Sequence, residues 1–326
     1  MINVKRLVLA GLLTAFAATV ANSQEALRFA NAASPGDRAE TAALRMIEII
    51  NQKIGARYKV SYCGSAALGA ERELTEGVKL GTIDFGMTSS AAMTTFVPQL
   101  AFYDMPFLFR DVDHARKVAT GSVGNKLLAA MEAADIKGLA TAESGFRNMI
   151  TNKTSVTKPA DMSGLKIRVI ESPAHIAAIR AMGASPVPIA FPEVYGSLQQ
   201  GVVDGLDLPL GNIAPPKLFE VTKYVSLTEH IYTPHMFIMN LALFKKMSAE
   251  DQKVVLDAAK EASDLERKIN DELVVKWSDE LKSKGMELIP VTTEQKAAFS
   301  DRMKPVWTQF EARIGKGLIE EAIATK

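Results

Sequence analysis

Predicted strands and helices alternate along the chain from residue 26, and this alternation limits the fold more than any other feature of the sequence. Runs typical of strands cover residues 26–33, 58–62, 83–87, 166–170, 187–189, 203–208 and 231–241. Helical spacing of apolar residues covers 37–53, 71–80, 173–183 and 192–200. Such alternation is typical of an α/β layer fold in which each sheet is mixed or parallel and is flanked by helices.

A second constraint is one unusually long helical pattern at about residues 249–284. Ser248 and Asp251 resemble a capping box at its start, and no Gly or Pro interrupts it before Gly285. A helix of this length would extend about 50 Å. A coiled coil is the competing interpretation, but it needs apolar residues at both the a and d positions over clean heptads, which this run does not keep. We therefore expect it to brace two lobes, which a chain of 326 residues is long enough to form.

Composition excludes several classes of function. Lys and Arg number 38 against 37 Asp and Glu, so the formal net charge of +1 provides no basic surface for nucleic acid. The single cysteine, Cys63, excludes a disulfide framework and a thiolate zinc site. The four histidines form no metal-binding helix motif, and we find neither a phosphate-binding glycine loop nor a nucleophile elbow. We expect no metal, no cofactor and no catalysis.

The N-terminal residues predict export. Lys5 and Arg6 precede an apolar run over 7–20, and the small residues of Ala21-Asn22-Ser23 suit a signal peptidase. This pattern predicts a signal peptide over 1–23, cleaved after Ser23, and a periplasmic protein. An uncleaved anchor is the alternative, although the run is short for a membrane-spanning helix. Cleavage would remove two positive charges and change the formal net charge from +1 to −1.

Arg168 is the first candidate for ligand binding. It lies on the predicted strand that precedes Glu171-Ser172-Pro173, where Ser172 would cap the next helix and Pro173 would open it. A guanidinium beside free helix amides suits a carboxylate. Judged alone, an arginine on an alternating strand is also compatible with a solvated surface, as is Arg147. Phe191, before Pro192, is by default a residue that packs on its helix start.

Six sequence blocks fall in order within residues 26–310. They are Leu68–Glu73, Gly81–Asp84, Pro106–Phe109, Gly164–Val169, Phe191–Tyr195 and Val203–Gly205. Together these blocks resemble the DctP family, the periplasmic solute-binding proteins of TRAP (tripartite ATP-independent periplasmic) transporters.

The resemblance implies a two-lobed fold in which hinge segments and one long helix join the lobes, which close on a ligand. Residues 24–144 and 234–273 would form lobe I, and residues 145–233 and 274–326 would form lobe II. It also implies roles for individual residues. Arg168 would pair with the ligand carboxylate and Arg147 would be a second arginine in the cleft. Phe191 would pack on the ligand, Glu71 would reach it, and Glu171 and Ser172 match further cleft positions.

Some residues depart from the sialic-acid-binding branch of this family. Leu208, beside Asp207, and Ser89 and Ala32 stand where that branch has polar or acidic partners for the ligand. An unpaired ligand hydroxyl costs about 1–3 kcal/mol. We therefore expect a smaller organic acid: a hydroxy or keto acid, a dicarboxylate or a short sugar acid.

The leading hypothesis is a monomeric binding protein that captures this acid and delivers it to the TRAP membrane permease. One alternative is a ligand-binding partner of a sensor kinase. Another is a periplasmic enzyme that uses the same cleft, for which the sequence offers only His235 and Glu71 as catalytic candidates.

Overall fold

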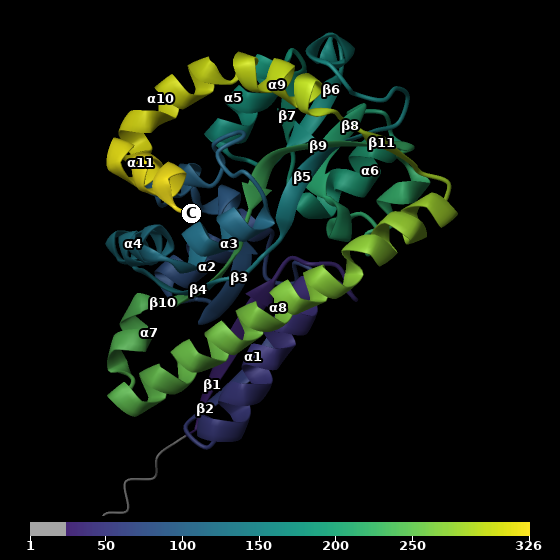
Figure 1. Ribbon diagram of the computed structural model, residues 1–326. Helices are drawn as coiled ribbons and strands as arrows, with labels where there is room; N and C mark the ends of the chain where they lie inside the picture. The colour runs from purple at the N-terminus through teal and green to yellow at the C-terminus, as the bar shows by residue number, and fades with distance from the viewer. Residues whose placement is uncertain (1–23) are drawn as a thin grey trace, which may run out of the picture.

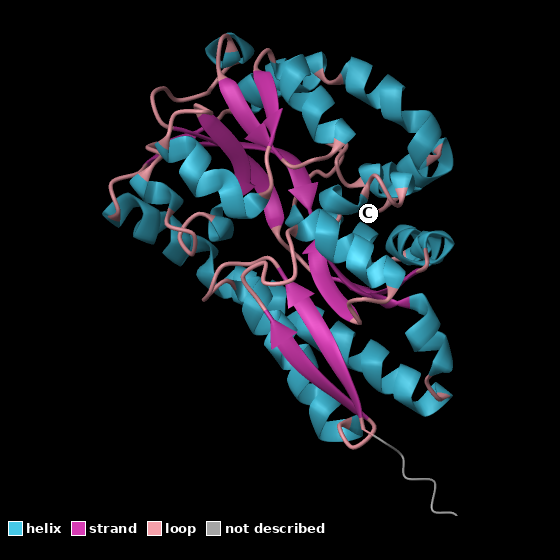
Figure 2. Cartoon of the chain, turned by 180° about the vertical axis from the view of Figure 1, so that it is seen from behind, coloured by secondary structure: helices cyan, strands magenta, loops and turns pink. Residues whose placement is uncertain are grey.

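A computed structural model describes residues 24–326, and the predicted signal peptide over 1–23 lies outside the described residues. The described chain forms two sheets, one with five strands and one with six, each flanked by helices (Figures 1 and 2). This arrangement confirms the expected two-lobed α/β architecture. We call the layers built on the five-stranded and six-stranded sheets the first and the second lobe.

The five-stranded sheet mixes parallel and antiparallel pairs. Its order is β2 (Tyr58–Cys63), β1 (Glu25–Asn31), β3 (Phe85–Ser89), β10 (His235–Asn240) and β4 (Ile136–Thr141). Strand β1 is parallel to β2 and β3, and β10 is antiparallel to β3 and β4. The rings of Phe29, Phe85 and Phe237 are fully buried in this lobe, and Phe29 lies 6.3 Å from Phe85 and 6.1 Å from Phe237.

The six-stranded sheet is also mixed. Its order is β11 (Glu287–Pro290), β9 (Tyr224–Thr233), β5 (Gly145–Thr151), β8 (Gly205–Pro209), β6 (Lys166–Val169) and β7 (Ser185–Pro188). Strand β5 runs antiparallel to both β8 and β9, whereas β6 is parallel to β7 and β8. The α-helices before residue 248 are α1 (Arg38–Ile54), α2 (Glu71–Leu80), α3 (Val112–Thr120), α4 (Ser122–Ala130), α5 (Pro173–Met182), α6 (Val194–Gln199) and α7 (Leu241–Lys246).

Two short segments carry the chain between the sheets. Residues 142–144 lead from β4 to β5, and Pro234 alone separates β9 from β10. The run at 231–241 is extended as expected, but it belongs to two strands, because Pro234 has no N–H for a ladder and marks the change of sheet. His230 and His235 therefore lie in strands of different sheets.

The long helix is present as α8 (Ala249–Ser283), with 35 residues. Ser248 caps it by accepting a hydrogen bond from the Asp251 N–H. It packs on α1 and β4 in the first lobe, and on β11 and the 3₁₀ turn η6 (Leu210–Asn212) in the second. Helix α8 thus connects both lobes along one side of the molecule (Figure 1).

The C-terminal helices differ from the expected division of the chain. Helix α9 (Thr293–Arg302) packs on α5 of the second lobe. Helix α10 (Lys304–Ile314) packs on α5 and also on the 3₁₀ turn η2 (Pro98–Phe102), and α11 (Lys316–Ala324) packs on α4 of the first lobe. Lys126 pairs with Glu321 at 2.6 Å, and His114 Nε2 lies 2.9 Å from the Ala322 carbonyl. Residues 274–326 are therefore shared between lobes, and the other lobe boundaries stay a prediction. Within residues 24–326, we find no helix with the length and apolar character needed to cross a membrane.

The bracing role of α8 can be tested by interrupting it. We expect Lys260→Pro to lower the free energy of unfolding by about 3 kcal/mol or more, because proline removes a helix hydrogen bond and clashes with the preceding turn. Lys260 is exposed and pairs only with Asp264. The control Lys260→Ala should cost no more than about 0.5 kcal/mol. Urea unfolding monitored by circular dichroism measures both, and equal midpoints would contradict the prediction.

Candidate functional site

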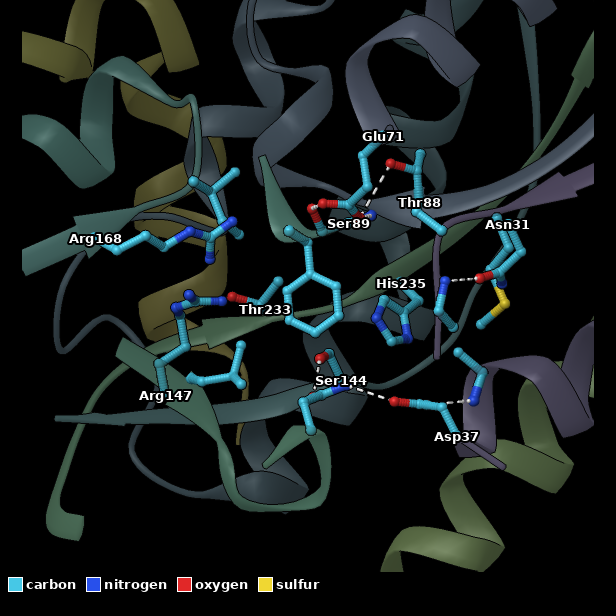
Figure 3. A pocket seen from close by; sticks show the side chains of 18 residues that line it. Asn31, Asp37, Glu71, Thr88, Ser89, Ser144, Arg147, Arg168, Thr233 and His235 are labelled. Carbon is cyan, nitrogen blue, oxygen red and sulfur yellow. Dashed lines mark hydrogen bonds between the residues drawn. The ribbon is translucent and has the colours of Figure 1, made fainter. Parts of the chain in front are cut away.

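A cavity lies between the two lobes. Both lobes contribute to its wall, as do Ser144 of the first crossing and Thr233 and His235 on either side of the second, which is the arrangement of a ligand site between domains. In Figure 3 the two arginines lie on one side and most of the remaining polar residues on the other. The lining residues are Asn31, Ala32, Ala33, Asp37, Ala39, Glu71, Met87, Thr88, Ser89, Ser144, Arg147, Arg168, Ile170, Phe191, Leu208, Asn212, Thr233 and His235.

Arg168 lines this cavity from β6 and is 1% exposed. Its Nε donates to the Ile189 carbonyl at 2.8 Å, and its Nη1 has no hydrogen-bond partner among the described residues. The Phe191 ring lies 6.0 Å from the guanidinium carbon. Burial, followed by repulsion from Arg147, lowers the pKa of Arg168 to about 10. The side chain is therefore still charged at neutral pH, and it holds donor capacity that the protein does not use.

Arg147 lines the same cavity from β5, but it already has an anionic partner. Its Nε donates to Asp207 Oδ2 at 2.6 Å and its Nη2 to Asp207 Oδ1 at 3.1 Å. Asp207 is fully buried on the neighbouring strand β8 and does not line the cavity. Asp207 thus fixes and neutralises Arg147 from behind. The two arginines, both expected in the cleft, thus differ in their electrostatic state.

A buried polar network extends behind Asp207. Burial alone would raise the pKa of Asp207, but Arg147 and the neighbouring His175 and His230 hold it well below its usual value. His175 lies 3.5 Å from Asp207 and 3.2 Å from Asp104. Burial lowers the pKa of His230, which favours its neutral form. The network rigidly supports the side of the cavity that carries Arg147.

Ser172 belongs to this network. As expected, it is the residue before α5, but its hydroxyl makes no capping hydrogen bond and instead donates to Asp104 Oδ2 at 2.8 Å. Ser172 is fully buried and does not line the cavity. Glu171 lines only a small adjoining pocket, which it shares with Arg168 and Glu71.

Glu71 stands across the cavity from the arginines (Figure 3). It is the first residue of α2, and its carboxylate accepts hydrogen bonds from the Ser89 N–H at 2.7 Å, the Ser89 hydroxyl at 3.1 Å and the Thr88 hydroxyl at 3.3 Å. Thr88 and Ser89 end the strand β3. Three donors therefore hold the carboxylate in one orientation.

Sequence reasoning missed the other polar residues on this side, among them Asn31 and Asp37. Asp37 caps α1 by accepting a hydrogen bond from the Ala39 N–H at 2.8 Å, and it also accepts one from Asn212 at 3.1 Å. In the sequence it resembles an ordinary helix cap, which gives no sign that it lines the cavity. Asn31 ends β1, a position that could have marked it, since ligands bind at the carboxyl ends of strands. His235, named only as a catalytic candidate, bonds Glu266 of α8 through Nδ1 at 2.8 Å.

The sequence-predicted residues thus divide into two groups. Six line the cavity: Arg168, Arg147, Phe191, Glu71, Ser89 and Leu208. Three lie behind or beside it: Asp207, Ser172 and Glu171. Among residues 24–326, we find no group of three or more acidic, histidine or cysteine side chains arranged to hold a metal ion.

The cavity between two α/β lobes matches a known class of protein. The family described as bacterial extracellular solute-binding protein, family 7, matches residues 29–313. The chain belongs to this DctP family. It is 44% identical over 272 residues to a solute-binding protein of Verminephrobacter eiseniae, with 83% of this chain and 81% of the relative covered. It is 36% identical over 279 residues to the 2,3-diketo-L-gulonate-binding periplasmic protein YiaO of Escherichia coli, covering 86% and 84%.

Solved structures of the DctP family agree in fold. A TRAP periplasmic solute-binding protein of Polaromonas sp. JS666, bound to D-erythronate, superimposes with a TM-score of 0.89 at 34% identity. The comparison covers 93% of this chain and 99% of that one. The resemblance inferred from the sequence blocks is therefore confirmed, and this chain is a solute-binding protein of the TRAP type.

The support that Asp207 gives to the cavity can be measured as stability. We expect Asp207→Asn to lower the free energy of unfolding by about 3 kcal/mol, because it leaves Arg147 buried without an anion. The folded-state pKa of Asp207 is depressed, so its contribution is present above the unfolded pKa of about 3.9 and is lost as the pH falls further. Urea unfolding at pH 7 and below pH 4 measures this difference.

The control variant is Asp301→Asn, since the Asp301 side chain is 74% exposed and pairs only with Lys304. Its cost should stay below about 0.5 kcal/mol. A variant Asp207→Asn as stable as this control at pH 7 would show that the buried pair contributes nothing.

Proposed function

We propose that this chain is the extracytoplasmic solute-binding subunit of a TRAP transporter. It binds a small organic acid through a carboxylate on Arg168, in the cavity between the lobes, and delivers the acid to the membrane permease. The observation that carries this proposal is the buried guanidinium of Arg168 with its unused Nη1.

A carboxylate is the partner that best suits Arg168. A planar guanidinium can donate two parallel hydrogen bonds to it, and charge-assisted bonds are the stronger kind. An unpaired buried charge destabilises a fold, whereas a ligand anion compensates it. Related proteins support this class of ligand, since the E. coli relative is named for 2,3-diketo-L-gulonate and the Polaromonas protein has D-erythronate bound.

The lobes are joined in a way that suits closing on a ligand. Two short crossings and α8 connect them, together with the contact of α11 on α4, and such a small number of connections suits a hinge motion. Arg38 of α1 reaches across to the second lobe. Its Nη2 donates to the Ser144 carbonyl at 2.6 Å and to Asn212 Oδ1 at 3.0 Å. These contacts border the cavity, so closure and ligand capture would occur together.

The cellular setting follows the same proposal. Residues 1–23 would act as a signal peptide cleaved after Ser23, and the mature protein would work in the periplasm beside the permease. We further propose that the bound acid leaves unchanged. His235 and Glu71, the two catalytic candidates, are engaged with Glu266 and with Ser89 and Thr88 respectively. Incubation of a bound acid with the protein, followed by mass spectrometry, would reveal any turnover.

The role of Arg168 is tested by binding. A thermal-shift screen of organic acids identifies a ligand, because saturation at a hundred times Kd adds about 2.7 kcal/mol to the stability. With that ligand, we expect calorimetry to show Arg168→Ala binding at least about tenfold more weakly, from the loss of a charge-assisted pair. Arg168→Lys should also bind more weakly, since a point charge cannot reproduce the two-donor geometry.

Arg180→Ala is the matched control. Arg180 is an exposed arginine near the end of α5, and its removal should leave Kd unchanged. Wild-type affinity in Arg168→Ala would refute the proposed function.

A further inference from the structure

The cations around the cavity differ in whether the protein already neutralises them. Arg168 is the one lining arginine without a carboxylate within 4.0 Å among residues 24–326. The other cationic or ionisable groups at or behind the wall have such a partner. The pairs are Arg147–Asp207 (2.6 Å), Arg38–Asp37 (3.9 Å), His235–Glu266 (2.8 Å) and His175–Asp104 (3.2 Å). The cavity wall therefore offers one positive charge that has no carboxylate of the described chain within ion-pair distance, and it can pair with one ligand carboxylate.

The opposite side of the cavity offers acceptors rather than further cations. A carboxylate has about four lone-pair sites. Glu71 uses three of them for Ser89 and Thr88, and Asp37 accepts from Ala39 and Asn212. Both carboxylates line the cavity and keep accepting capacity. A ligand hydroxyl can donate to such an oxygen, whereas a ligand carboxylate cannot.

His235 does not add an unpaired positive charge to this side of the cavity. It lines the same side, but its Nδ1 bonds Glu266, whose other oxygen accepts from the Glu143 N–H at 3.0 Å. If His235 is protonated, the pair with Glu266 carries no net charge. A second ligand carboxylate beside it would still face the negative charge of Glu71, and like charges in a confined site repel each other.

We propose that the cavity selects a short monocarboxylate that carries hydroxyl groups, and that it disfavours dicarboxylates. Arg168 receives the carboxylate, and Glu71 determines specificity by accepting a hydrogen bond from a ligand hydroxyl. This inference rests on the proposed function and narrows the candidate acids, of which dicarboxylates were one class.

Acids of equal chain length separate these features. Erythronate, succinate and butyrate each have four carbons. Erythronate carries hydroxyl groups, succinate carries a second carboxylate, and butyrate carries neither. The same series with five carbons (ribonate, glutarate, valerate) and six (gluconate, adipate, hexanoate) allows for the unknown length of the ligand. By calorimetry at pH 7, we expect the hydroxylated acid of one length to bind at least about 100-fold more tightly than both of its counterparts.

The variant Glu71→Gln tests the residue. We expect it to weaken the hydroxylated acid about tenfold or more, because a charged acceptor is lost, and to leave the dicarboxylate no weaker than in the wild type. Glu76→Gln on the exposed face of α2 is the matched control and should change neither affinity. The variant Ser89→Ala removes the hydroxyl that donates to Glu71 but leaves the negative charge of Glu71 in place. We therefore expect this variant still to disfavour the dicarboxylate.

The outcomes distinguish this inference from the proposed function. If dicarboxylates bind as well as the hydroxylated acids and lose affinity in Arg168→Ala, the function stands and the inference is wrong. The inference is equally wrong if no hydroxylated acid binds at any length, or if Glu71→Gln binds it with wild-type affinity. If no organic acid shows binding that depends on Arg168, the proposed function itself fails.

Discussion

The buried guanidinium of Arg168 is the constraint on which the rest of the site depends. A charge that is 1% exposed and has an unused donor would normally destabilise its surroundings. Here the backbone satisfies one of its donors through the Ile189 carbonyl, and the Phe191 ring lies nearby. The remaining donors are left for a ligand. The folded protein therefore keeps a buried positive charge that a small anion can neutralise.

The ligand site around this buried charge needs residues from both lobes. Arg168 belongs to the second lobe, while Glu71 belongs to the first, so neither lobe contains the complete site. The Arg38 contacts to Ser144 and Asn212 show that the lobes also meet through polar groups of the protein itself. A ligand held between Arg168 and Glu71 would add to these contacts. Part of the free energy of ligand binding would thus drive closure, as expected when a ligand prefers one of two conformations.

Local patterns predicted much of the fold and the central residues of the site. Strand and helix periodicity located β1, β6, α1 and α8, and the resemblance of the blocks around Arg168 and Glu71 indicated their place in the cleft. What local patterns could not supply were long-range pairings. The Arg147–Asp207 pair joins residues 60 positions apart, and the docking of α11 on α4 joins the chain end to the first lobe.

Two differences from the expectations have different causes. Ser172 precedes α5 as a cap residue should, but its hydroxyl donates to the buried carboxylate of Asp104, a partner 68 positions away that periodicity cannot reveal, and makes no capping hydrogen bond. The run at 231–241 is divided between two sheets at Pro234, a local feature of the sequence that lacks the N–H a ladder needs.

The distinction between the two arginines explains how one cleft can be both rigid and selective. Arg147, neutralised by Asp207 and supported by His175 and His230, is part of the wall. Arg168 has no carboxylate partner among residues 24–326, and it is the arginine that can pair with a ligand carboxylate. If both arginines were free, the cavity would attract dianions without regard to their shape. Because one is already paired, charge alone admits a single carboxylate, and the acceptors across the cavity can then discriminate by hydroxyl groups.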